Sequence, residues 1–267
     1  MNNLLKRSFS GLVFVSLFLF AILFSKESYI LLVSFFGMVA IWELSKITKL
    51  KSIITYILFS LAIFLMLKRP NSYAITLVLG INILSSSFLI YQLFRKKEII
   101  YITEREKMGL TIRYLIFSFC FLILLPFHDK IYAPNLMIAV LLLIWVNDSF
   151  AFIVGKNLGK RKLFISVSPK KTIEGFIGGF IFALIAAYII SISALNSVNF
   201  SLTNWFIIAA IVSIIGTIGD LVESKLKRQA NIKDSGTIMP GHGGILDRLD
   251  SLLFAAPFVY LYINFII

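Results

Sequence analysis

Charged side chains crowd into one short stretch of this chain, residues 224–250, which lies between two apolar segments. Its basic residues are Lys225, Lys227, Arg228, Lys233 and Arg248, and its acidic residues are Asp234, Asp247 and Asp250. Lysine and arginine hold phosphate groups through charge-assisted hydrogen bonds, and carboxylates are ligands of hard cations such as Mg²⁺. The stretch therefore predicts a site that binds phosphates together with a metal ion.

The ligand types that the sequence offers decide which metal to expect. With one Cys and two His in 267 residues, a zinc or haem site is nearly excluded, and carboxylates remain. Asp247 and Asp250 are spaced i, i+3 at the expected start of the last helix, which places them on one face. Asp220 is expected to close the preceding span on the same side. The three acids predict a Mg²⁺ site, although Asp247 alone would also suit an ordinary helix cap.

A glycine-rich turn, residues 240–244, precedes the last two acids. Glycine lets backbone amides approach a ligand closely, and oriented N–H groups form an anion nest. The amides of Gly243 and Gly244 are therefore candidate phosphate donors. His242 is a further candidate, with an interfacial hydrogen-bonding role as the alternative. A tight loop without a ligand would explain the glycines but not the histidine.

A second basic loop, residues 155–171, holds six basic residues and no acid. Loops of this kind ordinarily contact anionic headgroups, worth about 1 kcal/mol for each Lys or Arg, and this role accounts for the basic residues at 156–162. Residues 168–172 are more specific because they lead directly into a helix. We expect Lys171, and Asp148 from the preceding span, to complete the same pocket.

The composition indicates that membrane-spanning helices position these charged residues. The chain is 59% hydrophobic and 15% charged, whereas soluble domains are about 45–50% apolar and about 25% charged. The apolar runs do not alternate, which favours helices over a barrel, and a helix needs about 20 such residues to cross a bilayer. We expect an all-α polytopic membrane protein with about nine transmembrane helices. The expected spans are 9–24, 29–42, 53–67, 73–94, 114–127, 136–154, 173–195, 205–222 and 252–267.

The distribution of positive charge predicts the orientation. With nine spans and a cytoplasmic N-terminus, most of the 26 Lys and Arg residues fall on the inner side, as the positive-inside rule requires. The C-terminus would then lie outside, and both basic loops would face the cytoplasm. Residues 1–130 carry few charges within their spans, so we expect a transmembrane scaffold there and a catalytic region in residues 131–267.

Residue spacing over positions 145–255 resembles a known family. The pattern Ser224-x-x-Lys227-Arg228, then Lys233-Asp234, then Pro240-x-His242-Gly243-Gly244-x-x-Asp247-Arg248-x-Asp250 is similar to the signature of phosphatidate cytidylyltransferases (CDP-diacylglycerol synthases). Asn147-Asp148 and residues 168–175 also resemble family segments. Met239 stands where a branched aliphatic residue or Phe is usual. Residues 1–130 resemble the family only in being hydrophobic spans.

The resemblance implies that CTP and phosphatidate react to give CDP-diacylglycerol and pyrophosphate. It further implies Mg²⁺, alone or with a second cation, and a site on the cytoplasmic face of the inner membrane. Both substrates are polyanions, so the site must neutralise charge, and the lipid phosphate itself serves as nucleophile. The expected catalytic residues are Lys171, Asp220, Asp247 and Arg248, and the expected metal ligands are Asp220, Asp247 and Asp250. The expected substrate-binding residues are Asp148, Ser224, Lys227, Arg228, Lys233, Asp234, His242, Gly243 and Gly244.

Other functions fit parts of this pattern. A CTP-dependent lipid kinase acting on a polyprenol or phytol would release CDP instead of pyrophosphate. A transporter would suit many spans, but transporters carry broken helices at the midplane and internal repeats, whereas the polar residues here lie in loops. A CDP-alcohol phosphotransferase is disfavoured because the pattern beginning Asp-x-x-Asp-Gly is absent. The expected partners are the two substrates, the lipid bilayer and, from the resemblance, a second copy in a homodimer, with no nucleic acid.

Overall fold

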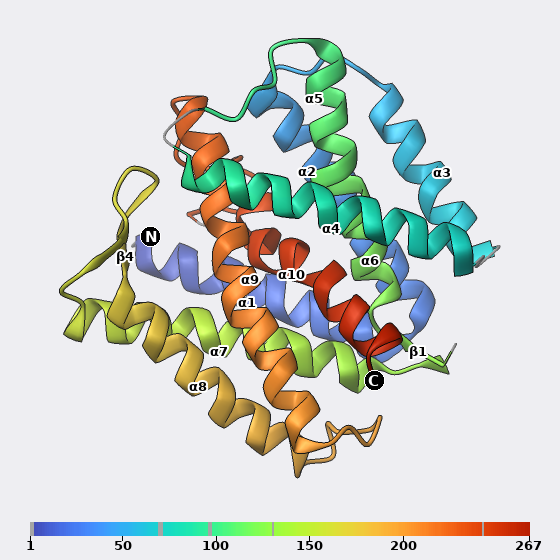
Figure 1. Ribbon diagram of the computed structural model, residues 1–267, viewed down its shortest axis with the longest axis vertical. Helices are drawn as coiled ribbons and strands as arrows, with labels where there is room; N and C mark the ends of the chain where they lie inside the picture. Colours follow the sequence, from blue (N-terminus) through green and yellow to red (C-terminus); the bar gives the residue numbers. More distant parts are fainter. Residues whose placement is uncertain (1–2, 69–71, 96–97, 130, 242) are drawn as a thin grey trace.

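The structure is a computed structural model that describes residues 3–68, 72–95, 98–129, 131–241 and 243–267 (Figure 1). It consists of helices joined by short loops and two small hairpins. The first half contains α1 (Asn3–Phe24), α2 (Lys26–Thr48), α3 (Ile54–Lys68), α4 (Ser72–Phe94), α5 (Glu104–Leu110), the π-helical segment η1 (Thr111–Ile116), α6 (Phe117–Leu124), β1 (Phe127–His128) and β2 (Ile131–Tyr132). The second half contains α7 (Pro134–Leu158), β3 (Lys162–Phe164), β4 (Ser168–Thr172), α8 (Ile173–Ser191), α9 (Leu202–Gln229) and α10 (Leu246–Phe265).

Long apolar helices confirm the prediction of a helical, multi-pass membrane protein. Within the described residues, six helices are long and apolar enough to cross a bilayer, namely Lys26–Thr48, Tyr73–Phe94, Glu104–Leu124, Pro134–Leu158, Ile173–Ser191 and Leu202–Gln229. Ser8–Phe24 and Ile54–Lys68 are apolar but shorter. The number of nine spans and the orientation of the two termini stay predictions.

The outer surface of the helices is apolar, as expected of a surface in contact with lipid. Leu77, Leu84 and Phe88 on α4 and Ile181 and Ile185 on α8 are all exposed. Since all backbone groups of a helix bond within the segment, such a surface is stable in a bilayer without polar partners.

The central helix is α10, which packs against α9, α6, α4 and α2 (Figure 1). Ala255, Ala256 and Val259 on this helix are fully buried. Gly219 on α9 allows α10 to approach closely, because a Cβ at this position would meet the side chain of Phe254 on α10. The charged first turn of α10 is thereby brought beside the end of α9.

The helix α9 is longer than the predicted span. Asp220 does not end the helix, which continues to Gln229, and the prediction that the membrane span itself ends near Asp220 stays a prediction. The apolar packing face extends through Leu221, Val222 and Leu226, all of which are buried, so the helix has a reason to continue beyond the purely apolar run. The residues at 224–229 are therefore helical, and only the later part of the charged stretch forms a loop.

The fifth predicted span is also displaced. The structure has a continuous helix over Glu104–Leu124, whereas the apolar run suggested 114–127. The helix begins early because Thr103 forms a capping box with Glu106, whose carboxylate accepts the Thr103 amide at 2.8 Å. It ends before the hairpin β1–β2.

The second basic loop folds into the hairpin β3–β4 over the ends of α7 and α8. Its entry is held by Glu174, whose carboxylate accepts the backbone N–H groups of Lys160 and Arg161 at 3.0–3.2 Å. Thr172 caps α8 by accepting the Gly175 amide at 3.1 Å. These contacts fix the strand that carries Lys171.

Glycines let α7 and α8 pack closely, as the GxxxG pattern at Gly175 and Gly179 indicates. A Cβ at Gly175 would lie 2.6 Å from the carbonyl oxygen of Ala151, and one at Gly179 would lie 2.6 Å from that of Asn147. Because these neighbours are backbone atoms, neither helix can adapt by changing a rotamer.

We predict that Gly179→Ala destabilises the protein by about 1–3 kcal/mol through overpacking. Gly80→Ala on α4 is the matched control, because a Cβ there would meet no atom within 4 Å. Thermal unfolding in one detergent should show a lower midpoint for Gly179→Ala and an unchanged or higher midpoint for the control. Equal midpoints for the two variants would contradict this account of the α7–α8 contact.

Candidate active site

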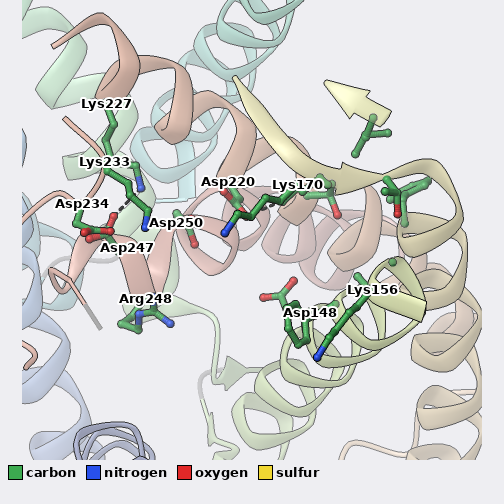
Figure 2. Close-up of a pocket in the computed structure, with 18 of the residues that line it drawn as sticks. Asp148, Lys156, Lys170, Asp220, Lys227, Lys233, Asp234, Asp247, Arg248 and Asp250 are labelled. Atoms are coloured by element: carbon green, nitrogen blue, oxygen red, sulfur yellow. Dashed lines mark hydrogen bonds and ion pairs between the residues drawn. The ribbon is translucent and has the colours of Figure 1, made fainter. Parts of the chain in front are cut away.

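A cavity of about 580 Å³ opens between α7, the start of α8, α9, α10 and the hairpin β3–β4. The acidic residues in its wall are Asp148, Asp220, Asp234, Asp247 and Asp250, and the basic ones are Lys156, Lys170, Lys171, Lys227, Arg228, Lys233 and Arg248. In Figure 2, Asp148 and Lys156 face Lys227 and Asp247 across the cavity, with Asp220 and Asp250 between them. Residues spread over a hundred positions of sequence thus share one site.

Lys227 connects α9 to α10 at the inner end of the cavity. Its Nζ donates to Oε2 of Glu223 and to Oδ1 of Asp247, both at 2.6 Å. The side chains of Glu223 and Asp247 are 1% and 6% exposed, so Lys227 neutralises two carboxylates that water scarcely reaches. The predicted phosphate-binding role of Lys227 would require one of these contacts to give way.

Asp247 is the most completely bonded acid of the site. Its Oδ2 accepts the amide of Ser235 at 2.8 Å, the hydroxyl of Ser235 at 3.0 Å and the amide of Gly244 at 2.7 Å. Gly243 donates its amide to the carbonyl of Met239 at 3.2 Å and has a φ of 92°, a conformation that favours glycine. In this structure the glycine turn holds Asp247, and its predicted role as a phosphate nest stays untested.

Asp220 forms the second ion pair of the cavity. Its Oδ2 lies 2.5 Å from Nζ of Lys171, and its Oδ1 accepts the hydroxyl of Ser224 at 3.2 Å. Burial by itself would lower the pKa of Lys171, but the charges of Asp220, Asp148 and Asp250 outweigh burial and raise the pKa above its ordinary value. Lys171 therefore remains a cation at neutral pH. Ser224 reaches the site through Asp220.

Asp148 and Asp250 each use only one carboxylate oxygen as a hydrogen-bond acceptor among the described residues. Oδ1 of Asp148 accepts from Asn147 at 3.2 Å, and Oδ1 of Asp250 accepts its neighbouring Ser251 amide at 2.7 Å. The other oxygen of each receives no hydrogen bond from the residues that the structure describes. These two oxygens, and the exposed carboxylate of Asp234, can take a new ligand.

The donor set suits Mg²⁺ only in combination with a substrate. Among the described residues, no group of three or more acidic, His or Cys side chains lies close enough to hold a metal by itself. Mg²⁺ is usually bound by one or two carboxylates together with substrate phosphates, and the free oxygens of Asp148 and Asp250 meet that requirement. Asp220 could contribute if Lys171 moves. Asp247 accepts the most hydrogen bonds of the predicted ligands.

The remaining predicted residues lie around the mouth of the cavity. Lys233, Asp234 and Arg248 line it, while Arg228 also donates to the carbonyl groups of Val167 at 3.4 Å and Ile232 at 3.1 Å. His242 lies outside the described residues, so its predicted role is not tested.

Several residues that line or support the site were not among the predicted site residues. Lys156 and Lys170 line the cavity, although Lys156 belonged to the residues expected to form an ordinary basic loop. Lys156 could have been found from its position eight residues after Asp148, on the same face of α7. Glu223 and Glu43 are fully buried beneath the site. The only hint to Glu43 was a single acid at the end of an apolar span.

One basic residue of the 224–250 stretch has a structural role instead. Nζ of Lys225 donates to the carbonyl groups of Gln92 at 2.5 Å, Leu93 at 3.4 Å and Arg95 at 2.9 Å. These are carbonyl groups at the end of α4, which have no partner within the helix. Lys225 thus caps α4 and faces away from the cavity.

Comparison with known proteins shows which family and which enzymes this chain resembles. Residues 5–266 match the cytidylyltransferase family. A phosphatidate cytidylyltransferase from Bacillus subtilis (strain 168) is 35% identical over 97% of both chains. Enzymes of the same description from Staphylococcus haemolyticus (strain JCSC1435) and Staphylococcus aureus (strain COL) are 51% and 48% identical over 43% of this chain and 44% of their own.

We predict that Lys227→Met lowers the stability of the protein by about 3–5 kcal/mol, because it leaves two buried carboxylates without a counterion. Lys162→Met, on the exposed face of β3, is the control and should change little. The thermal unfolding midpoints of the two variants in detergent measure the loss of stability. Adding Glu223→Gln to Lys227→Met removes one of the two buried carboxylates without a counterion, so the double variant should recover part of the lost stability. A Lys227→Met midpoint equal to that of the control would refute the charge-neutralising role.

Proposed function

The chain belongs to the cytidylyltransferase family, and from this premise we propose that the cavity is where CTP and phosphatidate react. The enzyme transfers the cytidylyl group of CTP to phosphatidate, giving CDP-diacylglycerol and pyrophosphate. The observation that carries the assignment to this cavity is its concentration of charge, seven basic and five acidic side chains around a single space of about 580 Å³.

Charge neutralisation is the main demand of this reaction. A nucleotide triphosphate and a lipid phosphate repel each other, and in water two unit charges 4 Å apart already interact by about 1 kcal/mol, more where water is excluded. Lys156, Lys170 and Lys233 line the cavity and form no ion pair with a described residue. We assign them, with Arg228, to the phosphates of the two substrates.

The bond changes need no protein nucleophile. A phosphate oxygen of phosphatidate attacks the α-phosphorus of CTP and forms the new pyrophosphate linkage. The bond from the α-phosphorus to the oxygen bridging the β-phosphorus breaks, and pyrophosphate leaves with that oxygen. Lys171 and Arg248 line the cavity, and we assign to them the stabilisation of negative charge on the α-phosphoryl group that is transferred.

We propose that Asp148 and Asp250 would hold a Mg²⁺ ion together with the phosphates of the nucleotide, and that Asp220 would be a third ligand once Lys171 turns to a phosphate. When bound, Mg²⁺ neutralises charge on the phosphate oxygens and orients the phosphates for in-line displacement. A second cation, or a metal at Asp247, would require Lys227 to leave one of its two carboxylates.

The topology that we propose has nine spans, a cytoplasmic N-terminus and the cavity open to the cytoplasm of a bacterial inner membrane. Support comes from the basic hairpin β3–β4 and the basic end of α9, which meet at the cavity mouth. A homodimer stays a prediction from the family resemblance. The lipid kinase and the transporter are not favoured, since the similar proteins are named as cytidylyltransferases.

Product analysis tests the function. Purified protein in mixed micelles with labelled CTP, phosphatidate and Mg²⁺ should yield CDP-diacylglycerol and an equal amount of pyrophosphate. Chelating Mg²⁺ with EDTA should stop both. Release of CDP with a phosphorylated lipid would show a kinase, and transfer that continues unchanged after chelation would exclude the proposed metal.

The cavity wall predicts a contrast between two lysines of one hairpin. Lys170 lines the cavity, whereas Lys162 is exposed outside it. Lys170→Gln should raise the KM for CTP or phosphatidate about 10–150-fold, since hydrogen bonds to charged groups are worth about 1.5–3 kcal/mol. Lys162→Gln should leave both KM values near those of the wild type. Similar effects of the two substitutions would show that only the general basic charge of the hairpin matters.

A further inference from the structure

We propose that Glu43, from the N-terminal half of the chain, is a positioning residue that sets the orientation of Asp247 in the active site. Glu43 lies in α2 and is fully buried. An isolated carboxylate in such a place is strongly unfavourable, so its partners determine why it is present. All of those partners belong to the loop and helix start that carry Asp247.

Glu43 supplies the cap that α10 lacks. Its Oε1 accepts the amide of Ile245 at 3.1 Å, and its Oε2 accepts the amide of Leu246 at 2.8 Å. The first amides of a helix have no partner within it, and the residue at the cap position, Ile245, has no side chain able to accept them. A carboxylate about 200 positions earlier in the chain therefore does what Ser or Asp does locally in other helices.

The same carboxylate reaches Asp247 by a second route. Oε2 of Glu43 lies 3.1 Å from the hydroxyl of Ser235, which lies 3.0 Å from Oδ2 of Asp247. The amide of Ser235 donates to the same Asp247 oxygen at 2.8 Å. Glu43 thus contacts both Ser235, which bonds to Asp247, and the first turn of the helix that carries Asp247.

Two glycines leave the space that Glu43 fills. A Cβ at Gly236 or at Gly244 would meet Oε1 of Glu43. The glycine at 244 was expected to bring a backbone amide to a phosphate. In the structure a side chain at this position would displace Glu43, which gives Gly244 a different reason to be glycine.

The consequence is a chain of contacts from α2 to the centre of the site. Glu43 orients Ser235 and the first turn of α10, and these orient Asp247. Asp247 in turn positions Lys227 between α9 and α10. Since Glu43 does not line the cavity within the described residues, it acts on the reaction through these groups and not by touching substrate.

A double-mutant cycle tests this coupling, and it uses the cytidylyl transfer of the proposed function as its readout. Glu43→Gln keeps the shape of the side chain but turns one acceptor into a donor that faces backbone N–H groups. Ser235→Ala removes the hydroxyl between Glu43 and Asp247. Both variants and their combination are purified in the full-length chain, and kcat and KM for CTP are measured for each at equal amounts of monodisperse protein.

We expect Glu43→Gln to lower kcat/KM about 10–100-fold and the double variant to lose at least threefold less than the product of the two single losses, because residues in one hydrogen-bond network are not independent. The control is Thr48→Val on α2, whose buried hydroxyl bonds only to Leu44 at 2.9 Å among the described residues. Thr48→Val should combine with Ser235→Ala multiplicatively. Multiplicative losses for Glu43 as well, or kinetic constants of Glu43→Gln equal to those of the wild type, would overturn the proposal.

A second variant serves if Glu43→Gln does not fold. Gly236→Ala removes no donor or acceptor and only presses a methyl group against Glu43. It should lower kcat/KM in the same direction and show the same less-than-multiplicative combination with Ser235→Ala, whereas Gly80→Ala should not. An unchanged kcat/KM for Gly236→Ala would overturn the role of Glu43. Wild-type protein that forms no CDP-diacylglycerol would instead overturn the proposed function.

Discussion

Buried charge must be compensated inside this protein, because neither lipid nor an apolar core offers water to do so. The chain of contacts Glu223–Lys227–Asp247 meets this constraint by placing one cation between two acids from different helices. Because each member would be costly alone, the three define how α9 and α10 lie against each other. The central position of α10 in the fold then transmits that geometry to the helices around it.

The cavity that we propose as the active site combines paired and unpaired charges in a way that suits polyanionic substrates. The pairs Lys171–Asp220 and Lys227–Asp247 keep the inner wall nearly neutral, so the cavity is stable without substrate. The lysines around them add positive charge that phosphate groups can neutralise. Substrate binding can therefore proceed by exchange of partners, with a phosphate replacing a carboxylate beside a lysine.

The two halves of the chain are less separate than their composition suggests. Glu43 of α2 caps α10, and Lys225 of α9 caps α4. The side chain of Gln229 bonds to both the amide and the carbonyl of Ile99 at 3.2 Å, which fixes the loop before α5. The helices of residues 1–130 thus contact the helices that carry the site through buried or half-buried polar side chains, in addition to the apolar packing expected of a scaffold.

Composition by itself determined that this is a helical membrane protein, and local spacing determined that Asp247 and Asp250 share a face at the start of α10. Hydropathy and i, i+3 spacing are local properties, and a helix obeys them wherever it packs. They could not reveal that α9 continues past Asp220, that the Gly244 amide holds Asp247, or that Lys156 faces the cavity. Each of these outcomes depends on which other elements pack against the residue in the folded protein. Only tertiary packing brought Glu43 to α10 and Lys227 between two acids, because a buried charge selects its partners by distance in space and not by distance along the chain.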